Sequence, residues 1–198
     1  MSSDIQAHAA TISRWRDGPA HYGALSRINH WVVAALMIGM LLSGLALEHA
    51  PLAQALAGTL RHWYKALGVV VLALGLWRVG WRLVQGFPEG GAAVPAWQAY
   101  AAKVAHWALL AAILLMPLSG VLMTLFAGRP IAVGPLTIPA APEVQWLAGL
   151  ARGVHAIGGT ALAALVVLHV GAALKHHLID RDGTLARMRL RLAPAGRA

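Results

Sequence analysis

The chain has 198 residues, of which 59% are hydrophobic and 12% are charged, whereas a soluble domain carries about 25% charged residues. Its formal net charge is +9 at pH 7, and it contains no cysteine. The composition therefore indicates a membrane protein, and it excludes disulfides, thiolate-held zinc and iron–sulfur clusters.

Four apolar runs follow one another along the chain, and each is close to the ~20 residues that a helix needs to cross a bilayer. They lie at residues 30–47, 66–84, 104–126 and 154–174. We predict an all-α protein, a four-helix transmembrane bundle over residues 27–178, with an amino-terminal arm at 1–26 and a basic tail at 179–198. The arm is polar, which argues against a cleaved signal peptide.

Proline and glycine mark the connections between these runs at residues 49–59, 85–97 and 128–143. The third connection has four prolines and would make a poor helix. Several tryptophans fall near the predicted helix ends, as in the aromatic belts of membrane proteins.

Lysine and arginine are distributed unequally between the two predicted sides of the membrane. Twelve of the 16 lie before the first run, near the 85–97 connection or after the fourth run, and four lie on the other side. The positive-inside rule therefore predicts that both termini are cytoplasmic. The basic tail is expected to face anionic lipid headgroups, and we predict no nucleic-acid partner because no folded basic domain is present.

Two histidines in the fourth run have an informative spacing. His155 and His169 are 14 residues apart, close to four helical turns, so both project from about the same face at depths that differ by roughly 21 Å. A histidine within a membrane is a candidate functional residue, and neutral imidazole is a strong axial ligand for haem iron. The simpler alternative is that each ring hydrogen-bonds to a neighbouring helix.

Depth identifies a partner for each of these histidines. His30 starts the first run at the predicted cytoplasmic face, where His169 also lies. His62 comes just before the second run at the outer face, where His155 lies. Facing helices of a bundle can build cofactor sites from such pairs. The pattern thus favours one haem near each side and an electron relay between them.

Several segments resemble the bacterial cytochrome b561 family, whose members are four-helix membrane proteins with two b-type haems. The segments are YGALSRINHW, KALGVVVLALGLWRVGWR, AHWALLAAILLMPLSG and GVHAIGGTALAALVVLHVGAALKHHLIDRDGTLARM. The resemblance implies haem b, two expected, with His30 and His169 binding the cytoplasmic haem. It implies that His155 and a histidine of the second helix bind the periplasmic haem.

The second helix departs from the family pattern H-K-x-L-G. The corresponding YKALG places Tyr64 four residues before Gly68, and His62 lies two residues earlier. Two residues turn a helix by about 200°, so His62 could reach the haem only if the helix began later or its register shifted. We predict His62 as the ligand, with Tyr64 as the alternative, since tyrosine binds ferric haem in catalase.

Three further side chains are candidates around the cytoplasmic haem. Arg78 and Arg82 are predicted to bind it by pairing with its propionates, since buried anions need charge partners, although both could simply anchor the helix. His106 begins the third helix and is a candidate for the surroundings of the haem or for a quinone site.

The resulting prediction is a membrane b-type cytochrome of the bacterial inner membrane. It would transfer electrons to or from quinone, with a small periplasmic donor or superoxide on the outer side, which would make it a superoxide:quinone oxidoreductase. Membrane lipid is an expected partner, and a homodimer is left open. Two alternatives are a haem-bearing membrane anchor subunit of a dehydrogenase or hydrogenase, and a haem-free transporter or metal channel.

Overall fold

The computed structural model describes residues 15–18, 21–88 and 94–189. Its long helices are α2 (Ala24–His49), α3 (Gln54–Gln85), α4 (Ala96–Leu125) and α5 (Gln145–Lys175). All four are long and apolar enough to cross a membrane, which confirms the predicted all-α, four-helix transmembrane fold. Each helix is longer than its apolar run, because hydrogen bonding of the helical backbone continues through the residues that flank the run, at the amino-terminal end in every case.

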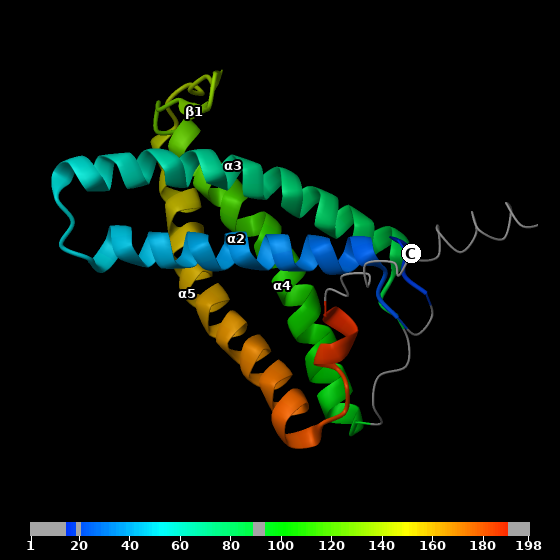
Figure 1. Ribbon diagram of the computed structural model, residues 1–198. Helices are drawn as coiled ribbons and strands as arrows, with labels where there is room; N and C mark the ends of the chain where they lie inside the picture. The colour runs from blue at the N-terminus through cyan, green and yellow to red at the C-terminus, as the bar shows by residue number, and fades with distance from the viewer. Residues whose placement is uncertain (1–14, 19–20, 89–93, 190–198) are drawn as a thin grey trace, which may run out of the picture.

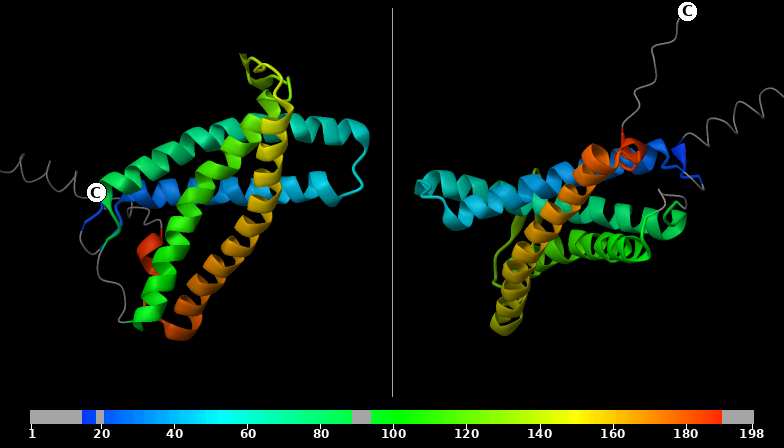
Figure 2. Two further views of the ribbon diagram at one scale, coloured as in Figure 1. Left: turned by 180° about the vertical axis from the view of Figure 1, so that it is seen from behind. Right: turned by 90° about the horizontal axis from the view of Figure 1, so that it is seen from below.

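The helices form two antiparallel pairs, α2 with α3 and α4 with α5, and the second pair is inclined to the first (Figures 1 and 2). Close packing joins α2 to α3, α3 to α4 and α4 to α5. The ring of His30, near the start of α2, has its centroid 6.4 Å from that of His169, near the end of α5. This approach brings residues far apart in the sequence to one end of the bundle.

The centre of the bundle is a small apolar core contributed by all four helices. It consists of Val33, Met37, Val71, Ile113, Met116 and Leu162. Many other large apolar side chains point outward, among them Leu42, Leu76 and Val167, which are 63%, 58% and 70% exposed. An outward apolar surface of this kind suits hydrocarbon rather than water as the surrounding medium.

The connection between α2 and α3 is shorter than the sequence predicts. Only residues 50–53 separate the two helices, so α3 begins at Gln54 and already includes residues 54–59 of the predicted loop. The predicted connection at 128–143 is not helical, and it contains a small hairpin of β1 (Ile131–Val133) and β2 (Leu136–Ile138). Ile131 is 1% exposed and anchors this hairpin against the bundle.

The carboxyl-terminal end of α5 turns back toward α2. A π-helical turn, η1 (His176–Asp180), extends α5, and a short 3-10 helix, η2 (Leu185–Met188), follows. The indole N–H of Trp31 donates to the carbonyl oxygen of Met188 at 2.8 Å. This contact fastens the described part of the tail to the first transmembrane helix.

Candidate functional site

Three histidines from three helices meet near the start of α2. The ring of His169, on α5, has its centroid 6.4 Å from that of His30 on α2 and 5.7 Å from that of His106 on α4. His106 also stacks on Phe87 at 5.7 Å. We call His30, His106 and His169 the inner histidine cluster. The structure thus brings together the two histidines that the sequence pairs by depth, and it adds the third.

The separation of His30 and His169 fits a shared metal ion. Two imidazoles, each bonded to one metal at about 2 Å, have ring centroids about 6 Å apart, and the observed value is 6.4 Å. Both rings are half-buried between helices. His106 uses one ring face against Phe87 and meets the edge of His169, which suits a neighbour of the pair.

Arg78 of α3 lies beside this cluster and links it to Asn29. Its guanidinium donates to the Oδ1 atom of Asn29 and to the Nδ1 atom of His30, each at 3.0 Å. Asn29 is 2% exposed, and within the described part of the chain its Nδ2 group has no acceptor. A buried donor without an acceptor is costly, so an anionic group at this position would complete the hydrogen bonding. The haem propionate expected from the sequence has this chemistry.

Arg82, the other predicted haem-binding arginine, has different partners. It forms an ion pair with Asp17 at 3.0 Å, and the two side chains are 6% and 3% exposed. Its guanidinium also lies over the rings of Tyr22 and Phe87. Arg82 therefore fixes the amino-terminal segment to α3, and its haem-binding role stays a prediction.

At the other end of the bundle, His155 of α5 is held in a defined orientation. Its Nδ1 atom lies 3.0 Å from the carbonyl oxygen of Met116 and 3.0 Å from the hydroxyl of Ser119, both on α4. A carbonyl only accepts, so Nδ1 carries the proton and Nε2 is left with its lone pair. Metal-binding histidines usually donate their other N–H group in this way. The sequence does not identify Met116 or Ser119 as partners of His155, because an apolar run does not show which backbone carbonyl or hydroxyl will face a neighbouring helix.

The partner of His155 across the bundle is Tyr64. The Tyr64 hydroxyl lies 3.4 Å from the Nε2 atom of His155, and the two ring centroids are 6.4 Å apart. His62 is exposed, and its ring packs against that of Trp63. The structure therefore does not bring His62 to His155, although the sequence pairs them by depth.

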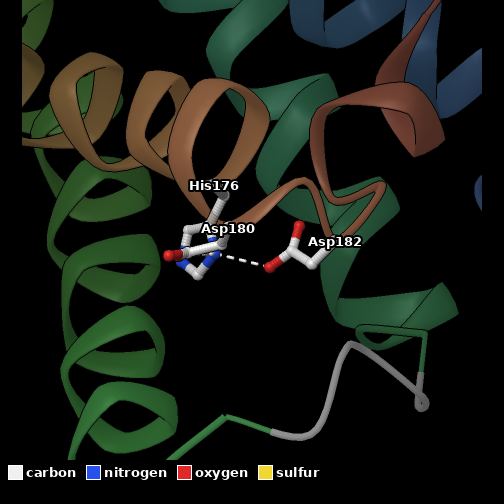
Figure 3. A group of neighbouring side chains, drawn as sticks. All are labelled: His176, Asp180 and Asp182. Carbon is white, nitrogen blue, oxygen red and sulfur yellow. Dashed lines mark hydrogen bonds and ion pairs between the residues drawn. The ribbon is translucent and has the colours of Figure 1, made fainter.

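A further group, His176, Asp180 and Asp182, lies at the end of α5 (Figure 3). One ligating atom of each falls within 4.8 Å of the others. The carboxylates already have cationic or hydrogen-bonding partners, since Lys175 contacts Asp180 at 2.6 Å and His176 contacts Asp182 at 2.6 Å. We interpret the group as a turn that holds the tail in place.

The fold and these contacts define a class of protein: a membrane helix bundle with a pair of histidines from two helices at one end and a histidine–tyrosine pair at the other. The family described as prokaryotic cytochrome b561 matches residues 21–190. The chain belongs to this family of bacterial multi-pass membrane cytochromes. Membership implies haem b as cofactor and is consistent with electron transfer, and the donors around the inner histidine cluster fit that group.

Curated relatives agree with this assignment. The chain is 30% identical to cytochrome b561 homolog 2 of Escherichia coli strain K12 over 172 residues, which cover 86% of the chain and 92% of that protein. It is 33% identical to cytochrome b561 homolog 1 of the same strain over 99 residues, 48% of the chain and 54% of that protein. It is 29% identical to cytochrome b562 of Cereibacter sphaeroides over 173 residues, 84% of the chain and 94% of that protein.

Proposed function

We propose that this protein transfers electrons within the bacterial inner membrane through a bis-histidine haem b held by His30 and His169. The observation that carries the proposal is the 6.4 Å separation of their ring centroids, between helices at opposite ends of the sequence. Bound haem would supply one-electron chemistry at this position. The chain would contribute the two imidazoles that hold the iron, the apolar surroundings and the arginine beside them.

The hydrogen bond from Arg78 suggests how the chain adapts to haem. A neutral imidazole that binds iron through Nε2 carries its proton on Nδ1. The Nδ1 atom of His30 now accepts from Arg78, and a guanidinium can only donate. We infer that Arg78 turns from His30 to a propionate when haem is bound, while the orphaned Nδ2 group of Asn29 provides a second donor for the same carboxylate. Arg82 lies one turn further along α3, where Asp17 already balances its charge.

The sidedness of the function rests on the charge distribution. Twelve lysines and arginines on one side against four on the other support cytoplasmic termini and an inner histidine cluster near the cytoplasm. The 27–178 bundle would then be embedded in lipid, and the basic tail would lie at the inner headgroups. Quinone is the membrane-soluble partner proposed for the inner site, with His106 beside it.

We extend the proposal to a second haem at the outer position, where the unprotonated Nε2 atom of His155 faces Tyr64. Four basic residues lie on that side, namely Arg61, Lys65, Arg129 and Arg152. They would attract a small anion, which supports superoxide or another small periplasmic reductant as the donor. Bis-histidine iron has no open position, so the inner site would exchange electrons rather than bind oxygen.

The test is haem analysis of the purified protein and its single variants. His30→Ala and His169→Ala should each remove one low-spin signal from the electron paramagnetic resonance spectrum of the oxidised protein. The control is His106→Ala, which should keep that signal because His106 is placed as a neighbour. All variants must remain in the membrane fraction and elute as the native protein does.

Full haem content and an unchanged spectrum in both His30→Ala and His169→Ala would refute the inner assignment. Loss of the low-spin signal in His106→Ala alone would move the axial role to that residue. Reduction by a quinol in vesicles, measured at the haem absorption bands, tests the proposed quinone partner separately.

A further inference from the structure

The helical register at the outer end of α3 decides which side chain can face His155. The helix begins at Gln54, so slightly more than two turns precede His62. His62 is therefore not at a fraying helix end, and rotating it inward would require breaking an established helix. Two residues later, about 200° around the axis, Tyr64 points into the bundle and Trp63 points outward with 55% exposure.

The contact between Tyr64 and His155 places two potential ligand atoms opposite each other. The phenol oxygen and the Nε2 atom are 3.4 Å apart, with the rings nearly perpendicular at 81°. Two metal bonds of about 2 Å would require about 4 Å between these atoms. The difference is small enough for a change in side-chain torsion angles to provide it. The proton on Nδ1 of His155, held by Met116, leaves Nε2 as the only ring nitrogen available.

Small cavities and glycines surround this pair of rings. Two cavities of about 30 Å³ adjoin Tyr64 and His155. Glycine lies next to each ring: a Cβ atom at Gly44 would be 3.3 Å from the Tyr64 hydroxyl, and one at Gly120 would be 3.2 Å from the Cε1 atom of His155. The remaining lining includes flexible methionines, whose side chains adapt readily to a ligand. They are Met37, Met40, Met116 and Met123.

We propose that Tyr64 takes the second axial position at the outer site, opposite His155, so that the chain has one bis-histidine site and one histidine–tyrosine site. This inference rests on the proposed function, because it assumes that haem binds at the outer position. It replaces His62 in that role. Tyr64 would bind as the phenolate and release its proton to solvent on binding, as metal ligands do. Ligand identity is a main determinant of haem potential, and an anionic oxygen ligand favours the ferric state. The outer site would then have the lower potential, which favours electron movement from the outer face toward the cytoplasmic site.

The experiment compares the native protein with its single variants by electron paramagnetic resonance in the oxidised state and by redox titration of the haem bands. The native protein should show one bis-histidine low-spin signal and a second signal of different character. Tyr64→Phe should change only the second signal, toward five-coordinate high-spin iron. Tyr64→His should convert it into a second bis-histidine low-spin signal with a higher potential. His62→Ala, the matched control on the same helix, should leave both signals unchanged.

Three results would overturn the inference. The first is a native protein with two bis-histidine signals, one of which is lost in His62→Ala. The second is a Tyr64→Phe spectrum identical to the native one. The third is a native haem content of one per chain that His155→Ala does not alter. The signal lost in His30→Ala serves as an internal reference in every sample. If that reference is present while the outer signals behave otherwise, the inference on Tyr64 fails and the proposed inner site stands.

Discussion

The buried ion pair between Asp17 and Arg82 gives the sharpest prediction about stability. Asp17 accepts hydrogen bonds from the backbone N–H of Gly23 at 2.8 Å, from the Ser26 hydroxyl at 2.9 Å and from Arg82 at 3.0 Å. Removing one member of a buried pair costs about 3–5 kcal/mol, because the other charge is left uncompensated. In Asp17→Asn an acceptor oxygen remains for Gly23, so we expect a loss near the lower end, about 3 kcal/mol.

The assay is equilibrium unfolding of the purified protein in mixed micelles, followed by circular dichroism and haem absorbance. Lys175→Met is the matched control, because the Lys175–Asp180 pair is 48% and 30% exposed and an exposed pair contributes less than about 1 kcal/mol. The double variant Asp17→Asn with Arg82→Met should regain part of the loss, since no unpaired charge stays buried. A loss in Asp17→Asn no larger than that in the control would refute the reasoning.

Three further predictions concern the tail and the helix packing. Trp31→Phe removes the indole N–H that donates to the tail, a hydrogen bond worth roughly 1 kcal/mol. Trypsin should therefore cut the tail about fivefold faster, and an unchanged haem spectrum would show that the bundle is intact. The hydroxyl and N–H of Thr184, followed by the ring of His176, lower the pKa of Asp182 to about 2, below its unfolded value of about 3.9. This contribution to stability is complete above about pH 4 and is lost as the pH falls toward 2. The acid transition in the fluorescence of Trp31, which contacts the tail at Met188, should therefore be absent in Asp182→Asn. Gly75→Ala would place a Cβ atom 2.7 Å from the Cγ2 atom of Ile113, and it should lower the free energy of unfolding by about 1–3 kcal/mol. Gly80 has open space around it, so Gly80→Ala should change stability by less than about 1 kcal/mol. Equal losses in the two alanine variants would contradict the packing argument.

The sequence alone determined the fold class and the order in depth of the candidate histidines. Four apolar runs of membrane-spanning length require helices, because a bilayer leaves no other way to satisfy the backbone of a single segment. The 14-residue spacing of His155 and His169 follows from helical geometry without any tertiary information. The pairing of His30 with His169 by depth agrees with their contact in the structure.

Tertiary structure decided which side chains meet at each depth. A run of apolar residues marks a span, but hydrogen bonding can extend the helix beyond it, and α3 does begin 12 residues before its apolar run. That extension fixes His62 on the outer surface and turns Tyr64 toward His155. The positive charge of Arg82 was evident, but its partner Asp17 lies far away in the sequence, and only chain folding brings the two together. Depth is a one-dimensional property that a sequence carries, whereas the facing of side chains depends on how helices rotate and cross when they pack.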